Sequence, residues 1–261
     1  MSTPVQDLFS LDCKCAVVIG GFGKIGYPMT EALAEAGARV YVASWSAHEA
    51  TGRIKELNER KLAVKGMELD QSDEAMVVAL LDQVTEEFRC PDILVNCGVE
   101  RPMRAYLNDT VESWDRSMVV NGRGLFIACR AFAKAMAANG GGSIINVTSI
   151  YGLVAPDPAM YDGSDINTEP DYPFTKGGMI MFSKYLAAYF ARAGVRVNCI
   201  APGGLFNNQP EPFYSRYVQK VPMRRMAIHD DIKGATVFLA SPASSYITGI
   251  VIPIDGGFTV L

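Results

Sequence analysis

Two tyrosines, Tyr161 and Tyr172, follow Ser149 by twelve and twenty-three residues, and each has the chemistry to exchange a proton with a reacting hydroxyl group. A phenol has a pKa near ~10, so work at neutral pH needs a neighbouring positive charge that stabilises the phenolate. Lys176 follows Tyr172 by four residues, which places both on one face of a helix. Asp165 has the same position after Tyr161, where its charge would raise the pKa of the phenol. The spacing alone leaves both tyrosines as candidates, of which Tyr172 has a lysine one helical turn later.

A glycine-rich segment follows the first apolar run of the chain. The run CAVVIG (15–20) continues into GGFGKIG, in which Gly21, Gly23 and Gly26 form the pattern G-x-G-x-x-G. Glycines allow positive φ angles and let the backbone approach a pyrophosphate, and a helix that begins here offers free N–H groups and a positive dipole end. Its place between a strand and a helix predicts a dinucleotide-binding loop.

Apolar runs alternate with amphipathic segments along the whole chain. Strands are expected at 15–20, 39–44, 62–69, 92–96, 142–149, 195–200 and 249–255, with helices between them, including 72–88 (N-cap Ser72), 111–139 and 173–194. Apolar strands separated by helices are typical of a parallel sheet covered on both faces. We predict an α/β fold, in which residues 1–261 form one Rossmann-type domain around a doubly wound parallel sheet of about seven strands. Two long irregular stretches, 153–171 and 203–227, are expected to cover a site.

The composition is that of a globular enzyme and excludes several other classes. Of the 261 residues 49% are apolar and 20% charged, and the net charge of −4 argues against a nucleic-acid-binding protein. No apolar run approaches ~20 residues, so no membrane span is expected. The N-terminal residues lack the pattern of a signal peptide, which makes a cytoplasmic location the expectation. The six cysteines lack zinc spacing and are expected to be free, mostly buried thiols, with no metal site.

The chain resembles the short-chain dehydrogenase/reductase family over nearly its whole length. IGGFGKIG is similar to the family's first motif, with Gly20 and Gly26 in matching positions and Ile19 and Lys24 as departures from it. NCGV, which begins at Asn96, replaces the usual Asn-Asn-Ala-Gly. Further matches are Asp70 in LDQ, Asn121 in VVNGRG, Ser149 in INVTSIYG, Pro202 and Gly203 in RVNCIAPGG, and the C-terminal YITGIVIPIDGG.

The resemblance implies hydride transfer between a nicotinamide and a secondary alcohol or ketone. Tyr172 would exchange the hydroxyl proton, while Lys176 would stabilise the phenolate and hold the cofactor ribose. Ser149 would hydrogen-bond the substrate oxygen as charge develops, and Asn121 would hold a water that links Lys176 to solvent. The separation of Ser149 and Tyr172 exceeds the family's usual spacing, which we interpret as an insertion of roughly 10 residues in the loop above the site.

The resemblance also implies a cofactor site, and the charges near it bear on which cofactor is used. The predicted cofactor residues are Gly20, Gly21, Phe22, Gly23, Lys24, Ile25, Gly26, Ser44, Asp70, Asn96, Lys176, Pro202, Gly203 and Leu205. A site that prefers NAD usually has an acid at the end of the second strand, where this chain has Ser44 and Trp45. Lys24, His48 and Arg53 are candidate partners of a 2′-phosphate. We therefore expect NADP or NAD, with NADP slightly favoured.

The loops predict a polar substrate. The stretch 153–171 carries acids and amides, whereas a lid over a long acyl chain would be more apolar. We predict a sugar-like substrate bound by Asp157 and Asp162 of this loop, by Glu211 of the second loop, and by Arg101, which suits a phosphate or carboxylate. A solvated acidic loop with surface arginines is the alternative. The loops are also loosely similar to short-chain reductases of bacterial surface-sugar and flagellin-glycan pathways.

Two rival functions have to be weighed against this one. A 3-oxoacyl-thioester reductase would share the catalytic residues, but it would need a basic surface for its acidic carrier protein. A non-catalytic nucleotide-binding scaffold or sensor is disfavoured by the complete set of Asn121, Ser149, Tyr172 and Lys176.

The two helices around the catalytic motifs are apolar over more than one face. This holds for the segments 117–137 and 177–191, and only one face of each can pack on the sheet. The surplus apolar surface predicts a homo-oligomer, and relatives in the family usually pair through these helices. We expect a tetramer, with the C-terminal IDGGFTVL as a second contact.

Overall fold

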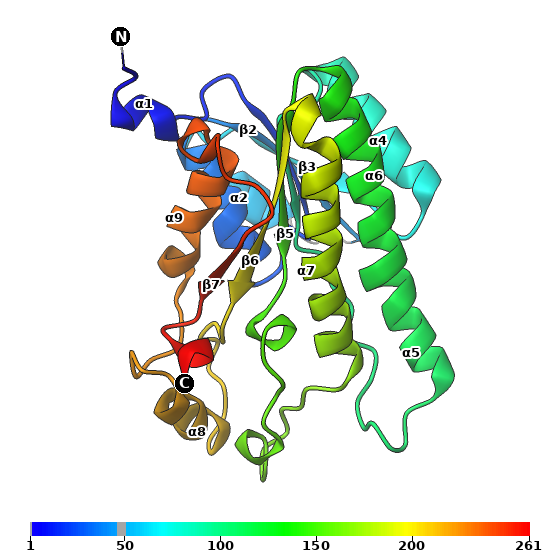
Figure 1. Ribbon diagram of the computed structural model, residues 1–261, viewed down its shortest axis with the longest axis vertical. Helices are drawn as coiled ribbons and strands as arrows, with labels where there is room; N and C mark the ends of the chain where they lie inside the picture. Colours follow the sequence, from blue (N-terminus) through cyan, green and yellow to red (C-terminus); the bar gives the residue numbers. More distant parts are fainter. Residues whose placement is uncertain (1, 46–50) are drawn as a thin grey trace.

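Seven parallel strands form one sheet in the computed structural model, which describes residues 2–45 and 51–261 (Figure 1). The strands are β1 (Cys15–Ile19), β2 (Arg39–Ser44), β3 (Val64–Glu68), β4 (Ile93–Asn96), β5 (Gly142–Val147), β6 (Val195–Pro202) and β7 (Val251–Ile254). Their order is β3-β2-β1-β4-β5-β6-β7, so the direction of winding reverses between β1 and β4. The predicted doubly wound parallel sheet is confirmed.

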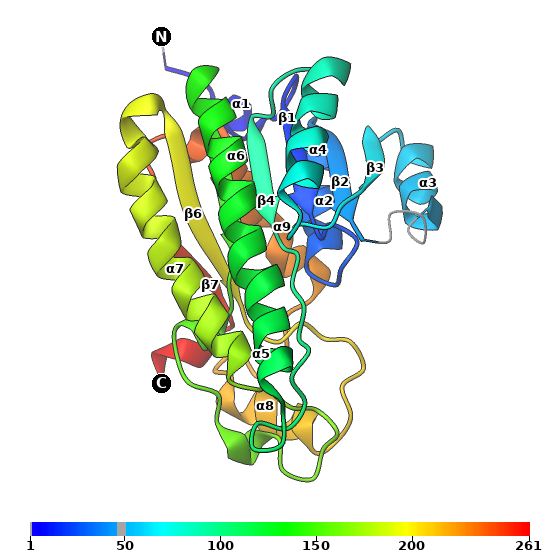
Figure 2. The same ribbon diagram turned by 90° about the vertical axis from the view of Figure 1, so that its right-hand side faces the viewer.

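Helices cover both faces of this sheet (Figure 2). They are α1 (Val5–Phe9), α2 (Gly26–Glu35), α3 (Thr51–Glu59), α4 (Glu74–Glu87), α5 (Val111–Ser117), α6 (Leu125–Ala138), α7 (Asp171–Phe190), α8 (Phe213–Lys220) and α9 (His229–Ala240). Val77 of α4, Phe132 of α6 and Leu186 of α7 belong to the core on one face. Leu33 of α2 and Ile232 of α9 belong to the core on the other. Within the described ranges no helix is both long and apolar enough to cross a membrane.

Three local features differ from the expectations. The helix expected at 111–139 contains a π-helical turn, Met118–Gly124, between α5 and α6. Asp73, and not Ser72, caps α4, because its Oδ1 atom accepts hydrogen bonds from the N–H groups of Ala75 and Met76. The stretch 203–227 is not irregular throughout, because it contains α8. All six cysteines are free, as expected, although Cys13 is exposed.

The carboxyl ends of the strands and the long loops lie at the same end of the molecule (Figure 1). The glycine-rich segment leaves β1 here, and Ser149 follows β5 by two residues. In an open parallel sheet, ligands bind outside this edge, close to the point where the winding reverses. The topology therefore places the loop and the catalytic motifs at one crevice.

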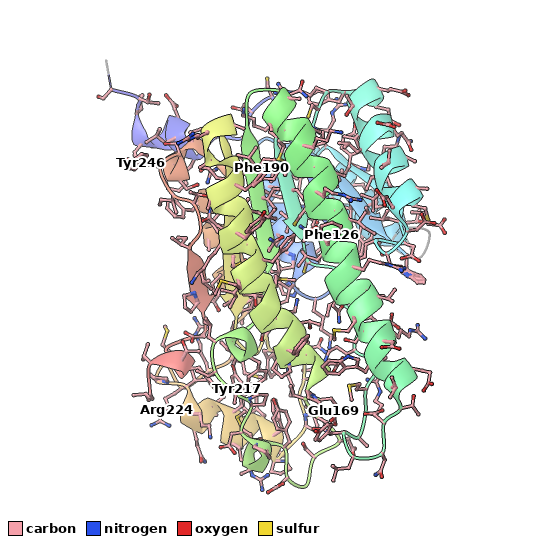
Figure 3. The ribbon with its side chains drawn as sticks, turned by 45° about the vertical axis from the view of Figure 1, so that its right-hand side comes forward. Phe126, Glu169, Phe190, Tyr217, Arg224 and Tyr246 are labelled. Carbon is pink, nitrogen blue, oxygen red and sulfur yellow. The ribbon has the colours of Figure 1, made fainter. Side chains whose placement is uncertain are left out.

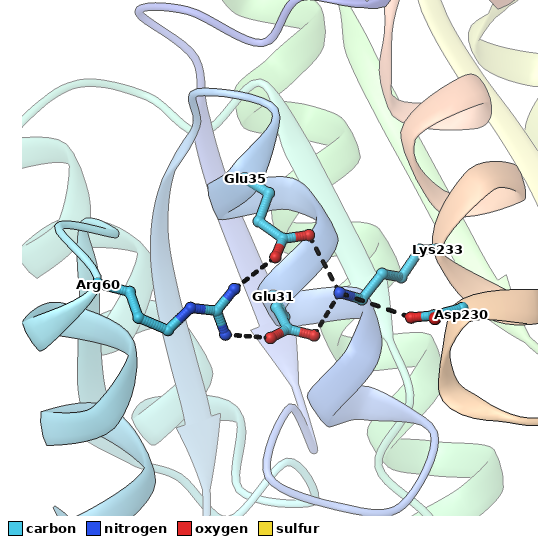
Figure 4. A network of polar contacts seen from close by, with 5 residues as sticks. All are labelled: Glu31, Glu35, Arg60, Asp230 and Lys233. Atoms are coloured by element: carbon cyan, nitrogen blue, oxygen red, sulfur yellow. Dashed lines mark hydrogen bonds and ion pairs between the residues drawn. The ribbon is translucent and has the colours of Figure 1, made fainter.

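A network of ion pairs joins α2, α9 and the end of α3 on the opposite side of the sheet from α7 (Figure 4). Glu31 pairs with Arg60 and with Lys233, the latter at 2.5 Å, and Glu35 bridges the same two cations. Burial alone would raise the pKa of Glu31, but hydrogen bonds from Arg60 and Lys233 outweigh it, so the pKa lies below its usual value. The carboxylate therefore stabilises the folded state above the pKa of the unfolded chain.

Replacing Glu31 by Gln should lower the free energy of unfolding by roughly 1–3 kcal/mol at pH 7, because two cations lose a charged partner. The difference should shrink as the pH falls below about 4, where the wild-type carboxylate is itself protonated. Denaturant unfolding at both pH values measures this. Glu59→Gln is the control, because its pair with Lys55 is largely solvated. Equal effects of the two substitutions at pH 7 would contradict the assignment.

Candidate functional site

Tyr172 lies in the first turn of α7, with two cations beside its ring. The Cζ atom of Arg101 is 4.5 Å and the Nζ atom of Lys176 is 5.7 Å from the ring centroid. Burial raises the pKa of Tyr172, while a hydrogen bond with Ser149 and the charge of Arg101 act in the opposite direction. The side chains of Ser149, Tyr172 and Lys176 are thus brought together as the sequence suggested.

Lys176 is buried one helical turn further along α7. Only 3% of its surface is exposed, and its Nζ atom donates a hydrogen bond of 2.7 Å to the carbonyl of Val147 at the end of β5. Burial lowers the pKa of Lys176 to about 8, so the ammonium group keeps its proton at neutral pH. The hydroxyl of Thr148 donates to the carbonyl of Lys176 at 2.7 Å. These bonds fix the helix against the strand end that carries Ser149.

Asn121 lies within the π-helical turn and binds the segment that follows β4. Its Nδ2 atom donates to the carbonyl of Glu100 at 2.7 Å and to the hydroxyl of Ser117 at 3.0 Å, and its Oδ1 atom accepts from the N–H of Glu100 at 2.8 Å. Both amide hydrogens are therefore in use. The side chain fixes the backbone next to Arg101, so a water relay to Lys176 would have to use main-chain atoms of the turn.

Tyr161 lies in a different environment from Tyr172. Its hydroxyl is 2.6 Å from that of Tyr151 and accepts a hydrogen bond of 2.9 Å from Thr168. Its ring packs against Phe213 of α8, with centroids 5.3 Å apart. This arrangement makes Tyr161 part of the wall of the pocket and supports Tyr172 as the proton-transfer residue.

The glycine-rich loop forms a backbone cradle at the end of β1. Gly20 has φ +76°, and a Cβ atom there would lie 2.6 Å from the N atom of Gly98. A Cβ atom on Gly26 would lie 2.2 Å from the carbonyl oxygen of Gly20. Glycine is thus required at both positions for the loop to close before α2 begins. The cradle fits a dinucleotide pyrophosphate.

A cavity of about 540 Å³ continues from this loop and suits the adenosine half of a dinucleotide. Gly20, Gly23, Ser44, Trp45 and Asp70 are among its lining residues. Two other predicted cofactor residues, Pro202 and Gly203, line the neighbouring catalytic pocket, as do Lys24, Ile25 and Lys176. Gly21 and Phe22 complete the loop itself, and His48 lies outside the described residues.

Two predicted cofactor residues do not have the expected place. The Nδ2 atom of Asn96 donates to Oδ1 of Asn146 at 2.7 Å and contacts the sulfur of Cys129, so this side chain faces the core. Leu205 is buried and pairs with Ala227 in an isolated β-bridge that anchors the second loop. Neither residue lines the described pockets.

The catalytic pocket has a volume of about 390 Å³ and walls of hydroxyl, amide and aromatic groups. Ser149, Tyr172 and Arg101 line it, together with Tyr161 and with Gln209 of the second loop, and it is completed by residues that were not predicted from the sequence: Tyr151, Thr168, Phe213 and Tyr217. The spacing of Phe213 and Tyr217, one helical turn apart, was the available signal for the last two. None of the described residues that line this pocket is an aspartate or a glutamate.

The predicted acidic substrate residues do not line this pocket. Asp157 forms an ion pair with Lys220, which holds the pKa of its carboxyl below the usual range. The backbone carbonyl of Asp162 accepts a hydrogen bond from Arg216. Asp162 also lines a separate cavity formed mainly by residues of the same loop. Glu211 accepts from the N–H of Ser215 at 3.2 Å. These carboxylates lie on the outside of the loops, where charge is solvated or paired, and only Arg101 of the four predicted residues reaches the pocket.

The two loops pack against each other above the pocket. Ile150, Met160, Phe213, Tyr217 and Met226 belong to a hydrophobic cluster separate from the two cores of the sheet. The hydroxyl of Tyr217, labelled in Figure 3, accepts a hydrogen bond from the N–H of Gly204. The loops thus form a joined cover with its own core.

Comparison with known proteins agrees with this geometry. The family model described as enoyl-(acyl carrier protein) reductase matches residues 23–259. The chain is 35% identical to a D-threitol dehydrogenase of Mycolicibacterium smegmatis, over 97% of this chain and 95% of the relative. It is also 35% identical to a galactitol 2-dehydrogenase (L-tagatose-forming) of Cereibacter sphaeroides, over 98% of each. A gluconate 5-dehydrogenase of Burkholderia cenocepacia, solved in complex with NADP and tartrate, superposes with a TM-score of 0.88 at 30% identity, covering 99% and 100% of the two chains.

Replacing Tyr172 by Phe should lower kcat by about 100-fold or more, because the proton of the reacting hydroxyl loses its acceptor. Tyr161→Phe, the matched control, should mainly raise KM, because it removes the bonds to Tyr151 and Thr168 but no proton-transfer group. Steady-state kinetics with a turned-over alcohol measure both. Loss of turnover in Tyr161→Phe together with its retention in Tyr172→Phe would reverse the assignment.

Proposed function

The chain belongs to the short-chain dehydrogenase/reductase family of NAD(P)-dependent oxidoreductases that interconvert alcohols and ketones, and we propose that its substrate is a polyhydroxylated, sugar-like molecule. The observation that carries the proposal is the wall of the catalytic pocket. Tyr151, Tyr161, Thr168 and Gln209 line the space beside Tyr172, and the hydroxyls of the first three are joined by hydrogen bonds, while the amide of Gln209 binds backbone groups of its own loop. A site built to hydrogen-bond hydroxyls discriminates strongly against molecules that lack them. The sugar-alcohol relatives and the gluconate 5-dehydrogenase support this class of substrate.

The catalytic residues have distinct tasks in this reaction. NAD(P), when bound in the cradle and the neighbouring cavity, supplies the hydride acceptor or donor. Tyr172 accepts the proton of the alcohol during oxidation and returns it during reduction. Lys176 and Arg101 stabilise the phenolate by their positive charges, and Ser149 hydrogen-bonds both the phenol and the substrate oxygen. Asn121 is a positioning residue that fixes the segment carrying Arg101.

NADP is proposed as the preferred cofactor because no acid stands at the end of β2. Ser44 and Trp45 occupy that place and line the adenosine cavity. Arg53 lies beside the glycine-rich loop, since its Nη1 atom donates to the carbonyl of Phe22 and its guanidinium lies 5.1 Å from the ring of Tyr27. A cation here, together with Ser44 and Trp45 in place of an acid at the end of β2, favours a 2′-phosphate.

A panel of substrates with both cofactors tests the reaction and its specificity. We expect kcat/KM for tetritols and hexitols, or for the corresponding ketoses, to exceed that for an acetoacetyl thioester at least tenfold, and to be higher with NADP(H). Ser44→Asp should reduce kcat/KM with NADP more than with NAD, because it adds a charge where the 2′-phosphate binds. A preference for the thioester would favour the acyl-carrier-protein reductase. Cofactor binding without turnover of any substrate would favour a scaffold or sensor.

A homotetramer is proposed from the outer faces of the helices that flank the site. Phe174, Met181, Tyr185 and Tyr189 form one stripe along α7, and each is more than 60% exposed. Phe126 of α6 is 45% exposed and is labelled in Figure 3. Helical spacing places these apolar side chains on one face, and a second copy of the chain would cover them. The exposed C-terminal residues Val260 and Leu261 offer a second contact.

Light scattering at micromolar concentration should give a mass of four chains, and Tyr185→Glu should reduce it by placing a charge in the stripe. Tyr106→Glu is the control, because Tyr106 is 65% exposed, against 63% for Tyr185, but lies outside the stripe. A monomeric wild type, or a tetramer unaffected by Tyr185→Glu, would contradict this arrangement.

A further inference from the structure

We propose that Arg101 forms an anion-binding subsite beside the reacting carbon, so that the sugar-like substrate carries a carboxylate or a phosphate. This inference rests on the proposed function and narrows its substrate class. It depends on the charges that line the catalytic pocket, on the unused hydrogen-bond donors of Arg101, and on the way in which its guanidinium is held.

The charge of the catalytic pocket is opposite in sign to that of the whole chain. The net charge of the chain is −4, yet the charged side chains among the described lining residues are Lys24, Arg101 and Lys176. Lys24 belongs to the cofactor loop, and Lys176 is buried with its ammonium bound to a backbone carbonyl. Arg101 is the cation left for a substrate, and a guanidinium is a favourable partner for an anion.

Arg101 has no acidic partner within the described part of the chain. Its Nη2 atom donates to the carbonyl of Asn167 at 2.9 Å and to the hydroxyl of Thr168 at 3.4 Å, and both acceptors are neutral. Arg116, at the same mouth of the site, is by contrast paired with Glu100. The Nε–H and Nη1–H groups of Arg101 remain as donors for a carboxylate or phosphate oxygen. An uncompensated guanidinium beside the catalytic phenol therefore suits an anionic ligand.

The guanidinium is held in one place before a ligand arrives. It lies over the ring of Tyr172, and Asn121 binds both backbone groups of the preceding residue, Glu100. Pre-organised donors lose less entropy when they bind a ligand. A group bound by Arg101 would lie close to the carbon that faces Tyr172.

The surroundings of Arg101 restrict where an anion can bind. Arg101 also lines an outer cavity of about 1060 Å³, whose acidic lining residues are Glu100, Glu112, Asp165 and Glu169. Glu100 is paired with Arg116, and Glu169 accepts hydrogen bonds from Tyr106 and Asn167. These carboxylates face the outer cavity and not the catalytic pocket. The inner side of Arg101 is therefore the favourable side for an anion.

Kinetics with substrates matched in length test the proposal. A sugar alcohol, the aldonic acid of the same length and the phosphate ester of that alcohol should be compared in wild type, Arg101→Gln, Arg101→Lys and Arg104→Gln. The wild type should prefer one of the anionic substrates at least tenfold in kcat/KM. Arg101→Gln should reduce that ratio by about 10- to 100-fold, and Arg101→Lys should retain part of it. Arg104→Gln is the control, because it removes a neighbouring cation that lines the outer cavity and binds the carbonyls of Arg101 and Met103, but leaves the guanidinium of Arg101 in place.

The ratio of kcat/KM for the anionic substrate to kcat/KM for the sugar alcohol separates anion binding from a second effect of Arg101. Arg101 lowers the pKa of Tyr172, so its loss should move the pH profile of alcohol oxidation to higher pH. That shift acts on neutral and anionic substrates alike and cancels in the ratio. The preferred member of the pair of anions distinguishes a carboxylate from a phosphate.

Two outcomes would overturn the subsite. One is a ratio of kcat/KM for anionic and neutral substrates that is equal in wild type and Arg101→Gln. If the wild type turns over sugar alcohols, this result refutes the subsite and leaves the proposed function standing. If no sugar substrate is turned over, the proposed function fails, and calorimetry still decides the subsite. Tartrate and inorganic phosphate should then bind the NADP-loaded wild type at least tenfold more tightly than Arg101→Gln. Equal binding to both would refute the subsite on its own.

Discussion

The burial of one ammonium group determines much of the arrangement of this site. Lys176 is almost fully enclosed, and removal of a cation from water is costly unless polar groups replace the solvent. The carbonyl of Val147 does so, and this requires α7 to lie against the carboxyl end of β5. The same contact delivers Tyr172, one turn earlier, to Ser149, which follows β5. The proton-transfer residues are therefore positioned by a bond that itself takes no part in proton transfer.

The π-helical turn extends this positioning to the other side of the phenol. An extra residue in a helical turn changes the direction in which side chains leave the helix, and such turns are frequent at functional sites. Here the turn places Asn121 against the backbone of Glu100, and thereby fixes the residue that stacks on Tyr172. The phenol of Tyr172 lies near Lys176 of its own helix and near Arg101 of the segment that follows β4. Two independent elements thus place a cation beside one phenol.

The parts of the site that were predictable from the sequence are those that depend on local spacing. Lys176 four residues after Tyr172, the glycines after the first strand, and the alternation of strands and helices all follow from backbone periodicity. The walls of the pocket depend on contacts between distant segments, which spacing does not encode. Asp157 and Glu211 have the composition of a substrate site, but charged groups remain outside where Lys220 or solvent can stabilise them. Asn96 matches a motif position, yet its neighbours in space, Asn146 and Cys129, bind its side chain in the core.

In the two loops above the site, charged side chains and hydroxyl groups lie on different sides, and this arrangement affects which substrates can bind. Charged pairs such as Lys220 with Asp157 join the two loops on the outside, while hydroxyls such as those of Tyr151 and Tyr161 face inwards. A hydroxyl both donates and accepts, so a wall of hydroxyls binds a sugar in either orientation of its O–H groups. Such a wall recognises hydroxyls without selecting one end of a polyol. An asymmetric element is then required to decide which carbon faces Tyr172, and Arg101, the pocket cation that belongs neither to the cofactor loop nor to the buried helix face, is the group that we propose for this role.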